Sequence, residues 1–200
     1  MSSSALLVGK VLIYVNDFSL GRGYVVQLSK PIWIVRDYIK CTGCRRCEIA
    51  CSLKHEDWIW PEASRIKVFM PFPGVEVPHV CAQCDDYPCV KSCPVDALSV
   101  DQVTTAVLVD REKCISCSKC IAACPGNVPF LHPKDNKATI CDLCNGDPEC
   151  TKVCTEANYD AIYVVDEEMS IQRKLFSRKP KDVAKQLAVN IYGEKGEKVI

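Results

Sequence analysis

Lys40–His55 reads KCTGCRRCEIACSLKH, a stretch in which four cysteines follow the spacing Cys-x2-Cys-x2-Cys-x3-Cys. The same spacing returns at Cys114–Cys124. A longer version, with four residues in its middle gap, occupies Cys81–Cys93, and one with five residues in that gap occupies Cys141–Cys154. The order short, long, short, long indicates the internal duplication of a unit with two cysteine groups.

This spacing is typical of 4Fe-4S clusters. Such a cluster presents four iron atoms that each take one soft thiolate, and a Cys-x2-Cys-x2-Cys loop offers three thiolates from one turn of backbone. In two-cluster ferredoxins the fourth cysteine, usually followed by proline, binds the other cluster. Pro94 and Pro125 follow the fourth cysteine of groups two and three, whereas Ser52 and Thr155 follow it in groups one and four. The sixteen cysteines therefore predict four 4Fe-4S clusters.

Two other cysteine frameworks fit the pattern less well. Disulfides are rare in the reducing cytosol, and the N-terminus Met1–Ser4 lacks the basic start of an export signal. Zinc ribbons pair two Cys-x2-Cys knuckles, which would leave the third and fourth cysteine of every group without a role. A zinc-stabilised scaffold with no redox role stays as the alternative from another class, and iron rather than zinc in the purified protein would decide against it.

The amino-acid composition and a few short segments exclude several kinds of binding partner. Lys and Arg number 25, as do Asp and Glu, and no basic stripe interleaves with aromatic residues, so we expect no nucleic acid to bind. The apolar run Ala5–Val15 is broken by Gly9 and Lys10 and is too short to span a bilayer. Gly21–Gly23 lacks the third glycine of a dinucleotide-binding turn. We therefore expect a cytoplasmic, non-catalytic protein without a membrane span.

Three regions are expected along the chain. Residues 1–35 form an N-terminal β extension, because Val11–Val15, Tyr24–Leu28 and Ile32–Val35 are short, β-branched runs. Residues 36–165 contain every cysteine and form a loop-rich, four-cluster domain. Residues 166–200 form a tail with a short helix, because apolar residues recur at helical spacing in Val183–Ile191.

The histidines and two tryptophans have simpler interpretations. Sixteen cysteines already satisfy four clusters, so His55, His79 and His132 are expected to be surface or hydrogen-bonded loop residues without acidic partners. Trp58 and Trp60 suit either local packing or a protein interface, since tryptophan is favoured in both settings.

The motifs resemble a known family. Lys40–His55, Val80–Leu98 (VCAQCDDYPCVKSCPVDAL) and Ile140–Cys144 (ICDLC) are similar to the four-cluster, polyferredoxin-like electron-transfer subunits of dimethyl sulfoxide reductase, formate dehydrogenase and polysulfide reductase. The resemblance covers about residues 32–165. Within the family, Cys51–Glu56 and Ser64–Val68 look like the small iron-sulfur subunits that accompany tungsten-dependent aldehyde oxidoreductases.

The resemblance implies an α+β fold made of two nested ferredoxin-like units, each with two clusters. The inner unit would span about residues 78–130, and the outer unit would combine 36–77 with 131–165. The implied function is to relay single electrons between a catalytic subunit with a tungsten or molybdenum pterin and a ferredoxin or other electron carrier. The alternative is a relay subunit of a hydrogenase, carbon monoxide dehydrogenase or formate dehydrogenase.

Spacing alone permits two ways of pairing the groups, sequential or nested. The resemblance favours nesting, in which groups two and three share one unit and groups one and four share the other. The predicted ligand sets are Cys41, Cys44 and Cys47 with Cys154; Cys141, Cys144 and Cys150 with Cys51; Cys81, Cys84 and Cys89 with Cys124; and Cys114, Cys117 and Cys120 with Cys93.

Overall fold

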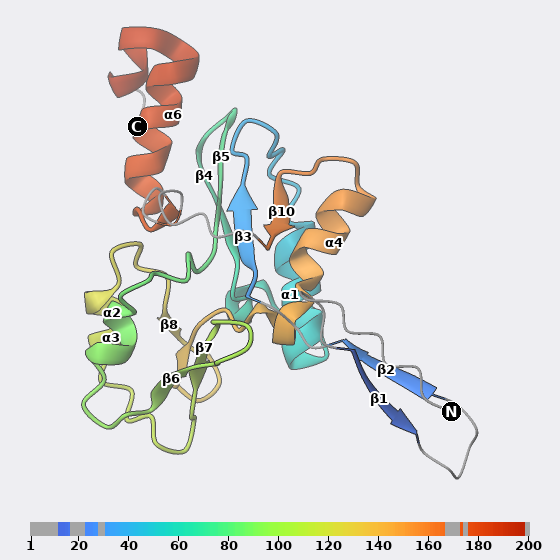
Figure 1. Cartoon of the computed structure of the whole chain (residues 1–200). Helices are drawn as coiled ribbons and strands as arrows, with labels where there is room; N and C mark the ends of the chain where they lie inside the picture. Colours follow the sequence, from blue (N-terminus) through green and yellow to red (C-terminus); the bar gives the residue numbers. More distant parts are fainter. Residues whose placement is uncertain (1–11, 17–22, 28–30, 167–172, 174–175, 199–200) are drawn as a thin grey trace.

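A computed structural model describes residues 12–16, 23–27, 31–166, 173 and 176–198 (Figure 1). Its elements are short, and within the described residues the strands pair only two by two, so that no larger sheet forms. No described helix is long and apolar enough to cross a membrane. A chain of this length with such small sheets needs something besides backbone pairing to hold its parts together.

The N-terminal strands occur where the sequence predicts them. β1 (Leu12–Asn16) and β2 (Gly23–Gln27) form an antiparallel hairpin in which Tyr14 lies opposite Val25. Val11 and Leu28, which the prediction also included, lie outside the described residues. β3 (Trp33–Arg36) does not join this hairpin. It pairs antiparallel with β10 (Ile162–Val165). The strand that precedes the cysteine-containing region in sequence therefore pairs with the strand that follows it.

Two pairs of helices pack together in different parts of the molecule (Figure 1). Helices α1 (Arg46–Glu56) and α4 (Glu149–Glu156) pack together, and α4 also contacts β10. Helices α2 (Pro88–Lys91) and α3 (Lys119–Ala123) pack together elsewhere. The other described strands and 3-10 turns are β4 (Lys67–Phe72), β5 (Val75–His79), β6 (Leu98–Val100), β7 (Val107–Val109), β8 (Phe130–Leu131), β9 (Ala138–Thr139), η1 (Pro61–Ala63), η2 (Leu143–Gly146) and η3 (Gly193–Lys198).

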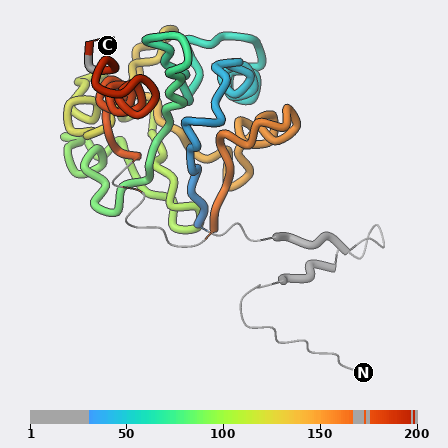
Figure 2. The backbone as a smooth tube through the Cα atoms, turned by 90° about the horizontal axis from the view of Figure 1, so that it is seen from above, coloured from blue at the N-terminus to red at the C-terminus, as the bar shows by residue number. Residues whose placement is uncertain are grey.

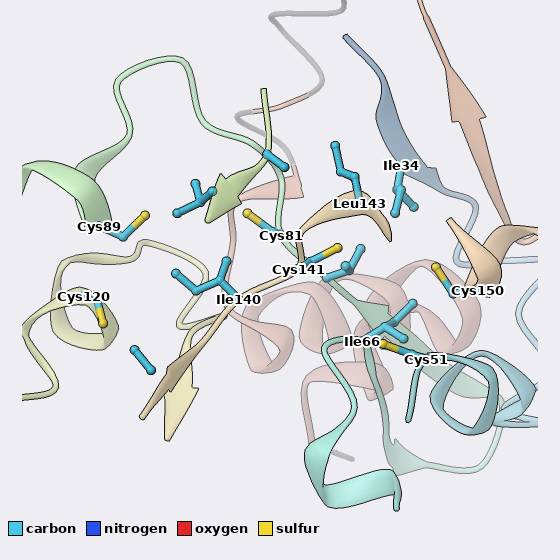
Figure 3. Close-up of a cluster of buried hydrophobic side chains, with 14 of the residues drawn as sticks. Ile34, Cys51, Ile66, Cys81, Cys89, Cys120, Ile140, Cys141, Leu143 and Cys150 are labelled. Carbon is cyan, nitrogen blue, oxygen red and sulfur yellow. The ribbon is translucent and has the colours of Figure 1, made fainter. Parts of the chain in front are cut away.

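Cysteines form much of the core. The main buried cluster combines aliphatic side chains such as Ile34, Ile66 and Leu143 with cysteines from all four groups (Figure 3). Four of the labelled cysteines in that view, Cys51, Cys81, Cys141 and Cys150, lie among these aliphatic residues. The main buried core therefore consists of cysteine thiols as well as aliphatic side chains.

The predicted C-terminal helix is observed as α6 (Pro180–Tyr192). It lies beside the β4–β5 hairpin (Figures 1 and 2) and buries Val183, Ala184, Leu187 and Ala188 in a second core with β5. The Tyr192 hydroxyl donates a hydrogen bond to the Pro73 carbonyl oxygen at 2.9 Å. These contacts fix the helix to the cysteine region through β5, which leads directly into group two.

Replacing Leu187 with alanine should loosen α6, at a cost of roughly 2–3 kcal/mol for a buried leucine. Amide hydrogen exchange in α6 should become faster, while exchange in α1 should not change. Ile191→Ala is the matched control, because Ile191 lies on the same helix and is 45% exposed. Equal acceleration in both variants would show that the β5 contact does not hold the helix.

Candidate metal centres

Three hollows in the structure are each lined by four cysteines. Each takes three cysteines from one sequence group and the fourth from another. We call them site A (Cys41, Cys44, Cys47 and Cys154), site C (Cys81, Cys84, Cys89 and Cys124) and site D (Cys114, Cys117, Cys120 and Cys93).

The four remaining cysteines also lie together. The Cys141 and Cys150 thiols both lie near Cys51, and Cys150 also lies near Cys144. Figure 3 shows Cys51, Cys141 and Cys150 around one region of the core, with Cys81 beyond Cys141. We call Cys51, Cys141, Cys144 and Cys150 site B. All sixteen sequence-predicted residues are thus gathered into four sets, and none of them forms a disulfide.

Helices and turns bring the sulfurs together. Cys47 and Cys51 lie one turn apart on α1, and Cys150 and Cys154 lie one turn apart on α4, so the packing of α1 against α4 joins groups one and four. On α2 and α3, Cys89 and Cys120 are brought together in the same way.

The cysteine loops adopt unusual backbone conformations. Non-glycine residues with left-handed φ occur in or beside each group, where they cost about 1–2 kcal/mol each in an L-residue. They include Arg45, Gln83, Ser118 and Leu143, with φ between 44° and 60°. Such strain persists only when the surroundings impose it. Here it turns successive thiols toward the same hollow.

Several of the buried thiols resist ionisation on their own. Burial, followed by the charges of neighbouring groups, raises the pKa of Cys47 to about 12, and burial raises the pKa of Cys81 to about 12 as well. Burial also raises the pKa of Cys84 and of Cys89 to about 11. Four thiolates in one hollow therefore need a cation among them, which a metal centre provides.

Backbone N–H groups point at several of the sulfurs. A backbone N–H points at a sulfur over 3.3–3.4 Å in four cases: Arg65 to Cys51, Ala97 to Cys93, Val128 to Cys124 and Ala138 to Cys114. Hydrogen bonds of this kind stabilise cluster ligands and influence the potential. A donor set of four soft sulfurs, with N–H groups around it, fits a 4Fe-4S cluster in each site.

Two histidines have acidic partners, so that part of the expectation is wrong. The His55 Nε2 lies 3.1 Å from Asp142 Oδ1, and its Nδ1 lies 2.7 Å from the Cys51 carbonyl oxygen. His132 is only 2% exposed and its Nε2 lies 3.2 Å from Glu56. Sequence patterns could not reveal these pairs, because His55 and Asp142 meet only through the packing of distant segments.

The third histidine is also buried, and the two tryptophans pack against other rings. His79 is buried in β5 and its Nε2 lies 2.8 Å from the Gly126 carbonyl oxygen, so it is hydrogen-bonded but is neither at the surface nor in a loop. Trp60 packs edge-on against His132, with 5.4 Å between the ring centroids. Trp58 packs against Trp60 and is 61% exposed.

Charged side chains lie close to the sulfurs of site B. Arg65 forms an ion pair with Asp142, which also pairs with His55. Burial would raise the pKa of Cys51, but hydrogen bonds from His55 and from the Arg65 backbone outweigh it and lower that pKa. Asp142, His55 and Cys144 offer ligand atoms within 4.8 Å of one another. These side chains surround the sulfurs of site B, whose own four cysteines already complete a cluster ligand set.

The folded chain is thus a ferredoxin-like protein built around cysteine-lined metal sites. A family model for the 4Fe-4S dicluster domain matches residues 74–160. A protein of Pyrococcus furiosus, the polyferredoxin-like subunit of an aliphatic sulfonate oxidoreductase, is 48% identical over 168 residues, which cover 84% of this chain and 97% of that one. The putative electron transport protein YsaA of Escherichia coli is 33% identical over 160 residues, covering 74% and 98%.

One solved structure is also similar in outline. The active site complex BamBC of benzoyl coenzyme A reductase matches 82% of this chain and 93% of that chain, with 22% identity and a TM-score of 0.41. The sequence matches are the ones that show the family. The chain belongs to the family of polyferredoxin-like 4Fe-4S electron-transfer proteins.

Replacing Gly43 with alanine should weaken site A. Gly43 has φ +68° in the loop between Cys41 and Cys44, and an added Cβ would lie 2.6 Å from the Met70 Sδ and 2.9 Å from the Glu76 Cγ. Left-handed backbone adds about 1–2 kcal/mol for an L-residue. Iron bound by this loop should be lost to a chelator several-fold faster than in the unchanged protein.

Gly193→Ala is the control for Gly43→Ala. Gly193 has a similar φ of +64°, but an added Cβ would meet nothing within 4 Å. Its iron release should match that of the unchanged protein. If both variants release iron at the same rate, the close approach of Met70 does not constrain site A.

Proposed function

We propose that this chain holds four 4Fe-4S clusters in sites A to D and relays single electrons in the cytoplasm. It would connect a catalytic subunit that carries a tungsten or molybdenum pterin with a ferredoxin or other carrier. The observation that carries the proposal is that the fold gathers all sixteen cysteines into four sets of four. Each bound cluster would take up and give back one electron.

The composition of the sets supports nested wiring. Cys154 lies with group one and Cys51 with group four, while Cys124 lies with group two and Cys93 with group three. Sequential pairing would instead place Cys51 beside the cysteines of group two. The packing of α1 on α4, and of α2 on α3, supports the same division into an outer and an inner unit.

The order of the sites supports a relay. Cys47 of site A lies near Cys150 of site B, and Cys141 of site B lies near Cys81 of site C. Sites C and D are joined by the packing of α2 on α3. The four sites therefore follow one another in the order A, B, C, D.

The ends of this row are the parts open to partners. Cys44 in site A and Cys117 in site D are the two exposed cysteines, whereas those of sites B and C are buried or partly buried. Ile39 and Ile115, which are 71% and 59% exposed, lie close in sequence to the end sites. An exposed ligand with an apolar neighbour suits contact with another redox protein at each end.

The catalytic partner is inferred from the resemblance of Cys51–Glu56 and Ser64–Val68 to subunits that serve tungsten enzymes. The Pyrococcus relative, named as a subunit of an aliphatic sulfonate oxidoreductase, supports a multi-subunit assembly. A hydrogenase, carbon monoxide dehydrogenase or formate dehydrogenase partner is the second candidate, because related motifs serve those enzymes.

Affinity purification of the tagged chain without oxygen should recover a second subunit that contains tungsten or molybdenum. Adding the substrate of that subunit should reduce the iron-sulfur centres of this chain, measured by bleaching of the broad visible absorbance. A partner that contains nickel, with no tungsten or molybdenum, would contradict the pterin assignment and favour a hydrogenase or carbon monoxide dehydrogenase partner.

Replacing Cys51 with alanine should disturb the cluster of site B and leave that of site C nearly unchanged. The reason is that Cys51 lies with Cys141 and Cys150, away from the hollow of site C. Redox-titrated electron paramagnetic resonance measures both signals. Cys124→Ala is the reciprocal variant and should disturb only site C. Loss of the site C signal in Cys51→Ala would reject the nested wiring.

A further inference from the structure

A buried arginine lies at the end of β3. Arg36 is only 3% exposed although its side chain is charged, and it follows three buried apolar residues of the same strand. Its Nη2 donates hydrogen bonds to the carbonyl oxygens of Val80 at 2.5 Å and Cys81 at 3.2 Å, and its Nη1 donates to the Phe176 carbonyl oxygen at 2.9 Å. Its buried Nε has no hydrogen-bond partner.

Carbonyl oxygens hold the guanidinium in place but do not neutralise its charge. Burying a charge is costly unless an opposite charge lies close to it. The side chains that act on the charge of Arg36 include Tyr38, Cys81 and Cys141. Cys81, whose carbonyl oxygen accepts a hydrogen bond from Arg36, belongs to site C, and Cys141 belongs to site B, so the charge of Arg36 acts on a ligand of each central site.

Bound clusters would supply the missing negative charge. A 4Fe-4S(2+) core with four thiolates carries about two net negative charges, so two neighbouring clusters would place about four negative charges around Arg36. A buried cation between them offsets their repulsion. It also favours the reduced state of each cluster, which is the more negative one, and so raises both reduction potentials.

The surroundings keep this charge away from water. The Phe176 ring lies 4.8 Å from the Arg36 Cζ, and the Tyr38 ring packs edge-on against Phe176 at 6.2 Å. Solvent would screen the charge if this cover were removed. Phe176 precedes α6, so the segment before that helix covers part of the Arg36 guanidinium.

We propose that Arg36 is the shared cation of sites B and C, a positioning residue that raises the reduction potentials of the two central clusters above those of otherwise equal four-thiolate sites. This inference rests on the proposed function, because it requires clusters in both sites. It adds to that function a reason why the middle of the row accepts electrons although it is buried.

Replacing Arg36 with methionine removes the charge and keeps much of the length. The test is redox-titrated electron paramagnetic resonance of the full chain, purified without oxygen, with iron counted in each sample. Two of the four midpoint potentials should shift downward in Arg36→Met, and the two belonging to sites A and D should stay in place. Arg36→Lys keeps the positive charge but lacks the planar guanidinium group. In this variant both potentials should lie close to those of the unchanged protein.

The control is Arg111→Met, which removes a charge from an exposed arginine that pairs with Asp135. It should leave the potentials of sites B and C unchanged. A purely structural role for Arg36 predicts that the lysine and methionine variants behave alike. Unchanged potentials in Arg36→Met with full iron content, or an equal shift of all four, would overturn the proposal.

A second variant decides the question if Arg36→Met fails to assemble. Phe176→Ala leaves Arg36 in place but admits water to its charge, so the same two potentials should shift downward by a smaller amount. No shift in that variant would also overturn the proposal. Fewer than four clusters in the unchanged protein would instead contradict the proposed function, which separates the two failures.

Discussion

The rest of the structure depends on how the negative charge of ionised cysteine thiols is stabilised inside the protein. Thiols gathered in fours do not ionise together in a buried hollow, as the raised pKa values of Cys47 and Cys81 indicate. A metal centre supplies the cation that lets them do so. The short helices, two-stranded sheets and left-handed loop residues of this chain would gain stability from that coordination, because backbone pairing among the described strands is short.

The same constraint accounts for the plan of the molecule. Two helices with cysteines one turn apart, α1 and α4, meet although they come from opposite ends of the cysteine region, and β3 pairs with β10 beside them. Polar groups then concentrate around the buried sites: Arg65, His55 and Asp142 at site B, and Arg36 between sites B and C. The end sites have exposed cysteines instead.

Local sequence patterns predicted the features that depend on residues close together in the chain. Cysteine spacing indicated the metal sites, and helical periodicity in Val183–Ile191 located α6, because both signals lie within a few residues. Pairings between distant segments were not predictable. Ile32–Val35 reads as part of an N-terminal β extension until β10 is seen beside β3, and His55 has no visible partner until α1 meets the loop of Asp142. Arg36 ends an apolar run, a signal that gains meaning only once the buried cysteines beside it are known.

The most direct test of the account is anomalous diffraction from crystals grown without oxygen, recorded on both sides of the iron absorption edge. The account predicts four strong iron peaks, one within each set of four cysteines, in the order A, B, C, D along the molecule. Fewer peaks would contradict it, as would a peak whose nearest cysteines come from two different sets. So would peaks that appear at the zinc edge and not at the iron edge.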